Sequence, residues 1–133
     1  MFQRFAASTA VASMVIAGAV LIVCFVPGLT FGRIYPLPIF WCVAPFAWGI
    51  WALLIPSAWM PSRLPLWGAI LGLIAGSLAA FVLNLPSRLF GAAVSLPLRG
   101  VAVLVMVLFY YLLWMLVRAA CRSLASAAPE NRR

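Results

Sequence analysis

Side chains that carry acid–base or metal-binding chemistry are almost missing from this sequence. Its 133 residues include no His, no Asp and no Lys, and the single acidic residue is Glu130. A catalytic triad, a carboxylate pair and a histidine metal site all require groups that the chain does not have. We therefore expect no catalytic residue, no metal ligand and no bound cofactor, and we expect the protein not to be an enzyme.

Two neighbouring tyrosines, Tyr110 and Tyr111, lie near the middle of an apolar stretch. Inside hydrocarbon a buried hydroxyl requires a hydrogen-bond partner. Because helical side chains lean toward the N-terminus of their helix, both phenols should point toward the depth of Ser77. We expect a polar clasp, a hydrogen bond from a tyrosine to Ser77 or to a backbone carbonyl. No His or membrane carboxylate is present to receive a proton, so this structural role is favoured over a redox or proton-carrying one.

Three tryptophans, Trp41, Trp48 and Trp51, are spaced so that their rings lie near one face of a predicted helix. Pro45, near the middle of the same helix, leaves the carbonyl of Trp41 without its helical partner and should bend the helix. This aromatic surface could hold an apolar ligand, a pigment or a quinone tail. Packed or lipid-facing aromatics beside a common proline kink are the favoured interpretation.

The three cysteines form no CxxC pair, so thiol exchange or metal transfer through that motif is unsupported. Cys24 and Cys42 should lie at similar depth near one membrane surface, where a disulfide is geometrically conceivable. Nothing in the sequence fixes the mutual rotation of their helices, so the sequence does not decide whether this disulfide forms. Cys121 is expected to be a free thiol.

All nine basic residues are arginines, and the formal net charge is +8. They are spread one or two to a connection, without a basic cluster interleaved with aromatic residues, so we expect no nucleic-acid partner. Arg118 and Arg122 lie four residues apart on one helical face at a predicted membrane surface. They should contact anionic lipid headgroups, at about 1 kcal/mol each, or an acidic loop of a partner protein.

Helices in a bilayer must position these residues. The chain is 68% hydrophobic and 8% charged, whereas a soluble domain keeps about a quarter of its residues charged. Apolar runs of about 20 residues, the length needed to cross the hydrocarbon core, occur four times. These runs do not alternate apolar and polar residues, which argues against a β-barrel. The predicted fold class is an all-α integral membrane protein, a four-transmembrane-helix bundle with spans at about 5–26, 38–55, 65–85 and 100–117.

The domain organisation is simple, with one transmembrane domain over residues 1–122 and a polar tail over 123–133. Positive residues in short connections stay on the cytoplasmic side. With the N-terminus inside, the outside set is Arg33, Arg88 and Arg99. The inside set is larger and contains Arg4, Arg63, Arg118, Arg122, Arg132 and Arg133. We therefore predict an N-in/C-in topology, with the connection 86–99 in the outer interface as a short amphipathic helix.

The most regular pattern is a ladder of small residues at every fourth position: Gly68, Gly72, Gly76 and Ala80. On a helix they share one face and leave it almost free of side chains. Membrane helices associate by close backbone approach and van der Waals contact, so this face should be a helix contact. The favoured partner is the first span, which has its own small series at Thr9, Ser13 and Ala17. The alternative partner is a second copy of the chain or another subunit.

The chain thus contributes shape and apolar contact to a membrane, and almost no titratable chemistry. We expect a noncatalytic small integral membrane protein that is a structural or accessory subunit of a larger membrane complex, or a homo-oligomer packed through the glycine ladder. The alternative is a small transporter or channel for an apolar or anionic solute, although transport sites normally carry a charged residue within a span. Expected partners are membrane lipids and other membrane subunits. The preference for Arg, Ala, Gly and Pro over Lys and Asn is typical of a GC-rich genome and favours a bacterial source. We therefore expect the protein in a bacterial cytoplasmic membrane.

Overall fold

The computed structural model describes residues 2–126, and within that range the chain is helical with no strand. One helix is a 3-10 turn (η1), and one is a π-helical turn (η2) that continues the α-helix before it. The elements in chain order are α1 (Phe2–Phe25), α2 (Leu37–Leu53), η1 (Ser57–Trp59), α3 (Leu64–Ser77), η2 (Leu78–Val82), α4 (Leu85–Phe90) and α5 (Leu96–Ser126).

The four α-helices that follow α1 all begin with the dipeptide Leu-Pro. Proline fits the first turn of a helix because the backbone N–H that it lacks has no helical acceptor there. At the other end of α4, Gly91 has a φ of +68°, the left-handed conformation that glycine adopts without strain. Local backbone chemistry therefore sets where most of these helices begin and where α4 ends.

Three helices are long and apolar enough to cross a membrane: α1, the 19-residue stretch Leu64–Val82 formed by α3 with η2, and Leu96–Ser123 of α5. The chain is therefore a membrane protein. The second predicted span, 38–55, corresponds to α2, which is apolar but has 17 residues. In the connection predicted over 86–99, a short helix is present as α4 and has six residues.

The predicted end of the last span at 117 and the domain boundary at 122 do not mark the end of a helix. α5 continues to Ser126, because no glycine or proline interrupts the sequence between Arg118 and that residue. Residues 127–133 of the predicted tail lie outside the described residues, and so do Arg132 and Arg133 of the charge count.

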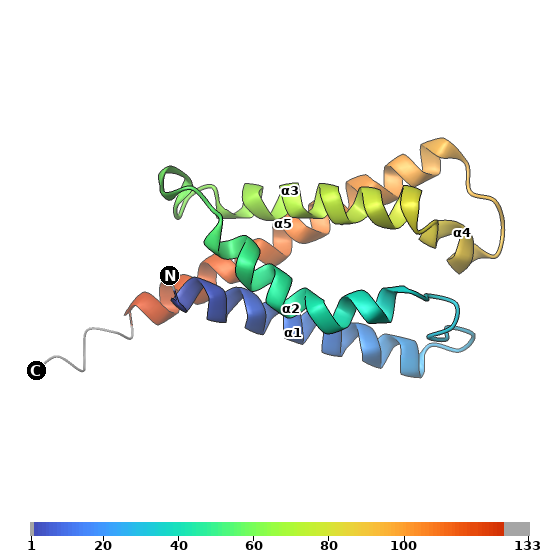
Figure 1. Cartoon of the computed structure of the whole chain (residues 1–133), viewed down its shortest axis with the longest axis horizontal. Helices are drawn as coiled ribbons and strands as arrows, with labels where there is room; N and C mark the ends of the chain where they lie inside the picture. Colours follow the sequence, from blue (N-terminus) through green and yellow to red (C-terminus); the bar gives the residue numbers. More distant parts are fainter. Residues whose placement is uncertain (1, 127–133) are drawn as a thin grey trace, which may run out of the picture.

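The long helices form two pairs, α1 with α2 and α3 with α5, and α1 also packs against α5 (Figure 1). The N-terminus, the connection 54–63 and the C-terminal part of α5 lie at one end of the molecule, which we call the terminal end (Figure 1). The connection 26–36, α4 and the start of α5 lie at the opposite end, the distal end (Figure 1).

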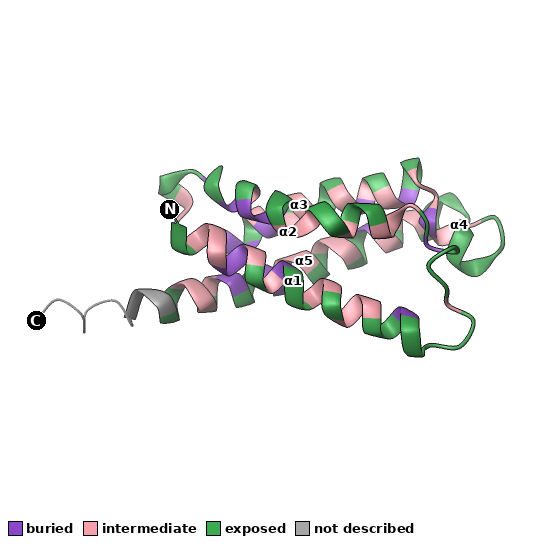
Figure 2. Ribbon diagram, turned by 60° about the horizontal axis from the view of Figure 1, so that its bottom comes forward, coloured by how far each residue is buried: buried purple, intermediate pink, exposed green. Residues whose placement is uncertain are grey.

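The hydrophobic core lies in the terminal half of the molecule. Trp114 of α5 is completely buried in it, with its ring 6.0 Å from that of Trp48 of α2 and against Gly68 of α3. Ala7 and Ala12 bring α1 close to this cluster. In Figure 2 buried residues gather where α1 and α5 approach each other near the terminal end. The two helix pairs are thus joined mainly through this half.

Candidate functional site

A partly open cavity of about 510 Å³ separates the two helix pairs in the distal half of the molecule. Small residues from three different helices line it: Gly18 and Ala19 of α1, Ala44 of α2, and Ala75 of α3. Because these residues face a common space and carry no large side chain, the helices leave a volume between them. We call this volume the inter-pair cavity. Its size lies within the range of about 300–1,000 Å³ that is typical of ligand sites.

Aromatic rings form part of the cavity wall. Trp41 and Trp48 of α2 line it, together with Phe109 and Tyr110 of α5. The rings of Trp48 and Tyr110 are 5.1 Å apart at an interplanar angle of 51°. This contact spans the two helix pairs and closes the cavity on the side of the core. The lining is almost wholly apolar, so the arrangement suits a hydrocarbon chain or another apolar group rather than an ion.

Two of the three tryptophans proposed as a ligand surface therefore lie at the cavity, and Trp51 does not. The indole of Trp51 stacks on that of Trp67 in α3, with 4.8 Å between ring centroids and an interplanar angle of 20°. Each indole also donates a hydrogen bond to the other residue's carbonyl, Trp51 Nε1 to Trp67 at 3.1 Å and Trp67 Nε1 to Trp51 at 2.9 Å. This reciprocal tryptophan clasp joins α2 to α3. Sequence reasoning missed this clasp. The available signals were the six tryptophans and the fact that a buried indole N–H usually finds a hydrogen-bond acceptor.

The glycine ladder faces α5 and not the first span. A Cβ added at Gly68 would overlap the Trp114 side chain, and one added at Gly72 would lie 2.7 Å from the Cβ of Tyr110. A Cβ added at Gly76 would lie 3.0 Å from the Cβ of Met106. Ala80 is buried at the end of the same series. Gly68, Gly72 and Gly76 thus each lie against a bulky residue of α5, so these three positions of the ladder meet α5 and not the first span.

The two α1 residues expected to meet the ladder, Ser13 and Ala17, are both exposed. The Ser13 hydroxyl donates to the carbonyl of Thr9 in its own helix at 2.9 Å. Thr9 provides the α1 contact to the second helix instead, since its hydroxyl donates to the Pro45 carbonyl at 3.2 Å. The rotation of α1 therefore turns the rest of that small series away from the bundle.

The predicted polar clasp between the tyrosines and Ser77 is absent from residues 2–126. Tyr110 sits over Gly72 and against Trp48, between α3 and α2, and the ladder determines that position. Ser77 follows Gly76 on α3 and lies off the ladder face. Tyr111, the next residue of α5, is half-buried. The Tyr110 ring therefore packs against Gly72 and the Trp48 ring, away from Ser77.

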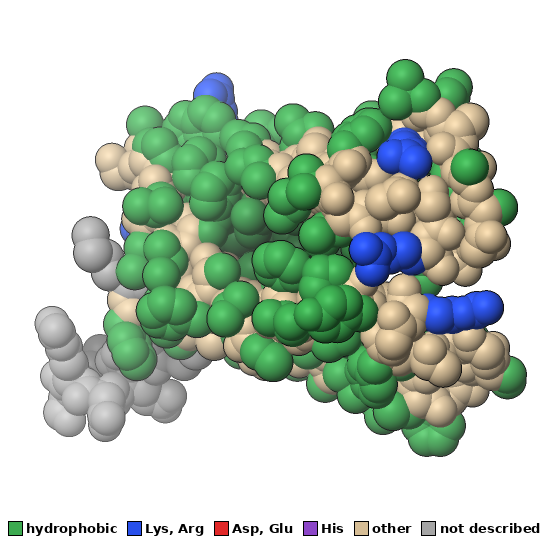
Figure 3. Space-filling model, turned by 45° about the vertical axis from the view of Figure 1, so that its right-hand side comes forward, with side chains coloured by type: hydrophobic (Ala, Val, Ile, Leu, Met, Phe, Trp, Pro, Cys, Tyr) green, Lys and Arg blue, Asp and Glu red, His purple; other side chains and the backbone are tan. Residues whose placement is uncertain are grey.

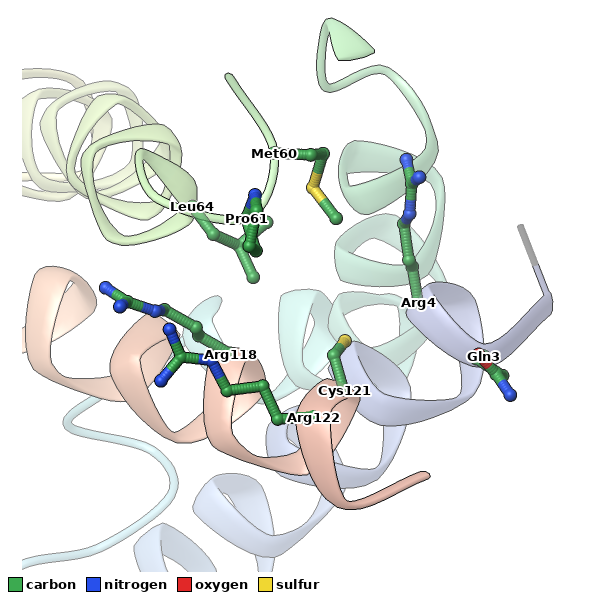
Figure 4. A pocket seen from close by; sticks show the side chains of 8 residues that line it. All are labelled: Gln3, Arg4, Met60, Pro61, Leu64, Arg118, Cys121 and Arg122. Carbon is green, nitrogen blue, oxygen red and sulfur yellow. The ribbon is translucent and has the colours of Figure 1, made fainter. Parts of the chain in front are cut away.

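A second, smaller pocket of about 270 Å³ lies at the terminal end. It is lined by Arg118, Cys121 and Arg122 of α5, by Arg4 of α1, and by the connection before α3 (Figure 4). Both arginines singled out in the sequence thus share a pocket with a third that was not. All three cysteines are free thiols, so the disulfide considered between Cys24 and Cys42 is not formed.

The surface between the two ends is apolar. In Figure 3, which turns the distal end toward the reader, hydrophobic side chains cover the middle of the molecule and arginine side chains lie toward its ends. Together with the three long apolar helices, this distribution defines an all-helical membrane protein with an apolar cavity between two helix pairs. No protein-family model, no curated protein and no solved structure matches the chain.

Proposed function

We propose that this chain is a noncatalytic integral membrane protein whose role is to hold the apolar chain of a membrane amphiphile in the inter-pair cavity. The observation that carries the proposal is the cavity itself, about 510 Å³ of apolar space walled by Trp41, Trp48 and Phe109. A water-filled cavity of this lining would leave apolar surface wet, whereas a hydrocarbon chain regains van der Waals contact with it.

The position of the cavity favours a lipid over a water-soluble ligand. It lies between Gly18 of α1 and Met106 of α5, in the apolar middle of two long helices. A ligand reaching this depth travels through the bilayer, and acyl or isoprenoid chains already occupy that medium. The few polar atoms nearby, such as the hydroxyl of Tyr110, would orient a ligand without holding a charge.

We further propose four membrane passes with both termini in the cytoplasm of a bacterial cell. In support, four of the described arginines lie at the terminal end and three at the distal end, and the start of α1 and the C-terminal part of α5 share the terminal end (Figure 1). α2 lies beside α1 and connects the distal end to the terminal end (Figure 1). Local thinning of the bilayer and snorkelling of flanking side chains accommodate a helix of 17 residues.

An accessory role in a larger membrane complex fits this proposal better than transport. A protein that retains a lipid chain presents it, or a surface shaped by it, to a neighbouring subunit. Purification in a mild detergent should recover other subunits in fixed stoichiometry. Flux of an apolar or anionic solute from liposomes containing the pure protein would instead support the transporter alternative and contradict this role.

The cavity is tested by filling it. Ala44→Phe places a ring in the inter-pair cavity, while Ala47→Phe places the same ring on the exposed face of the same helix. We expect native mass spectrometry of the detergent-purified protein to find one retained lipid on the wild type and on Ala47→Phe, and none on Ala44→Phe. The melting temperatures of the three proteins, measured in the same detergent, control for folding.

Equal lipid retention by the wild type and by a folded Ala44→Phe variant would contradict the proposal. A wild type that carries no lipid after purification from its membrane would contradict it as well.

A further inference from the structure

The smaller pocket at the terminal end brings together positive charges from two helices that are far apart in sequence. Arg4 comes from the first turns of α1, and Arg118 and Arg122 come from α5. Figure 4 shows the Arg118 and Arg122 guanidinium groups beside one another, with Arg4 on the opposite side and the Cys121 thiol between them. We call this cavity the arginine pocket.

These charges have no anionic partner in the part of the chain that the structure describes. Residues 2–126 contain no Asp or Glu, because the single acid of the sequence is Glu130. The Nε atom of Arg118 is buried and donates no hydrogen bond. A buried donor without an acceptor costs free energy, and neighbouring guanidinium groups repel one another. An anion in the pocket would relieve both costs.

Apart from Gln3, the remaining wall of the arginine pocket is formed mainly by apolar side chains. Met60, Pro61 and Leu64, from the connection before α3 and its first residue, lie opposite the arginines of α5 (Figure 4). A site for a small inorganic anion alone would gain nothing from this wall. A phosphate group that is attached to a glycerol and acyl chains would contact both kinds of surface.

We propose that the arginine pocket binds the phosphate group of an anionic phospholipid, with Arg118 as the principal donor and Arg4 and Arg122 beside it. The planar guanidinium fork matches phosphate oxygens in geometry, and its charge strengthens each hydrogen bond. This site shares no residue with the inter-pair cavity and lies at a different position, so a test of one proposal does not decide the other.

Headgroup selectivity is the first test. The wild type is equilibrated with mixed micelles of phosphatidylglycerol and phosphatidylcholine, and native mass spectrometry counts which lipid is retained. We expect preferential retention of phosphatidylglycerol, weakened about fivefold by Arg118→Gln and about 25-fold when Arg122→Gln is added.

The matched control is Arg63→Gln, which removes one charge from the same end of the molecule. Arg63 lies over the Trp59 ring at 5.8 Å and does not line the pocket. Its loss should leave retention unchanged within twofold. Equal weakening by Arg63→Gln and Arg118→Gln would reduce the effect to general surface charge and overturn the proposal. Arg118→Lys keeps the charge and removes the buried Nε donor, so a folded Lys variant with full retention would also overturn the role given to Arg118.

Cys121 supplies an independent reporter inside the pocket. In a Cys24→Ala, Cys42→Ala background it is the single remaining cysteine, and its maleimide labelling rate is measured in nanodiscs with and without phosphatidylglycerol. We expect the anionic lipid to slow labelling at least fivefold, and Arg118→Gln to remove that protection. A cysteine at exposed Ser62 in a background without Cys121 reports the general effect of membrane charge and should lack this protection.

The source of the phosphate is settled in the same assay. Inorganic phosphate added to neutral nanodiscs should not protect Cys121. Protection by millimolar inorganic phosphate as strong as that by the lipid would assign the pocket to a soluble anion and overturn the lipid assignment. Protection of the cysteine at position 62 equal to that of Cys121 would overturn the pocket itself.

Discussion

The two halves of this molecule use small residues for opposite purposes. In the terminal half, Gly68 receives the ring of Trp114, and α3 and α5 pack closely. In the distal half, Gly18 of α1 has nothing within 4 Å of where a side chain would begin, and it lines a cavity with Ala44 and Ala75. Whether a small residue gives close packing or open space depends on what lies opposite it.

The arginines of the two ends differ in whether they donate hydrogen bonds to the chain itself. At the distal end, Arg88 donates to the Tyr35 carbonyl at 2.8 Å, and Arg99 donates to the Val94 carbonyl at 3.2 Å. Arg33 donates to the Gly28 carbonyl at 3.1 Å. These guanidinium groups hold the distal connections together. The arginines of the terminal pocket have no such role within residues 2–126, which leaves them available to a ligand.

The largest effect expected from this contrast comes from one substitution made in both halves. Gly68→Ala should destabilise the protein by about 3 kcal/mol, because the added methyl overlaps Trp114 in a packed core. Gly18→Ala should leave stability unchanged or raise it by up to about 1 kcal/mol, because alanine favours the helix and meets no atom. SDS-induced unfolding in mixed micelles, followed by tryptophan fluorescence, measures both free energies of unfolding.

A compensating variant sharpens this prediction. Replacing the ring opposite by a smaller side chain, with Trp114→Leu in the Gly68→Ala background, should recover part of the lost stability. Equal destabilisation by Gly68→Ala and Gly18→Ala would show that the two halves do not differ in packing.

The tryptophan clasp should give the next largest effect. Trp51→Phe and Trp67→Phe each remove one indole N–H donor and should each cost about 1 kcal/mol. Because the two hydrogen bonds and the stacked rings act together, the double variant should cost less than the sum of the single variants. Additive losses in this double-mutant cycle would mean that the two indoles act independently.

Removing a distal arginine should have a smaller effect. Arg88→Gln loses the hydrogen bond that links α4 to the connection 26–36, at a cost of about 0.5–1 kcal/mol. Arg122→Gln, which removes the same charge at the terminal end, should not lower the free energy of unfolding in neutral detergent. A loss from Arg122→Gln equal to that from Arg88→Gln would remove the distinction between the two sets.

The smallest effect is expected for Ser13→Ala on the exposed face of α1. Its hydroxyl contacts only the Thr9 carbonyl of the same helix, so the change should stay within about 0.5 kcal/mol. Thr9→Ala, one turn earlier, should cost more because its hydroxyl reaches the Pro45 carbonyl of α2. Equal costs would show that α1 is rotated differently from its position in this structure.

Part of the candidate site was visible in the sequence. The aromatic surface of α2 was considered as a place for an apolar ligand, although packed or lipid-facing rings were the favoured interpretation. Trp41 and Trp48 line the cavity, while Trp51 stacks on Trp67. Arg118 and Arg122 were predicted as a pair, but Arg4 joins them only because α1 packs against α5. No spacing along the chain relates residue 4 to residue 118, so this pocket could not be predicted.

The sequence by itself determined that the protein is helical and lies in a membrane. Long apolar runs with almost no charge place the backbone in hydrocarbon, where no water can bind its polar groups, so these groups must pair within helices. Leu-Pro pairs mark where four of the helices begin. The same sequence also showed that α3 has a face made for close contact. Only the tertiary structure decided that α5 covers this face, that α1 turns Ser13 and Ala17 outward, and that Gly18, Ala44 and Ala75 face a cavity. The reason is physical: a small side chain permits a close approach, but helix order and rotation decide which partner makes it.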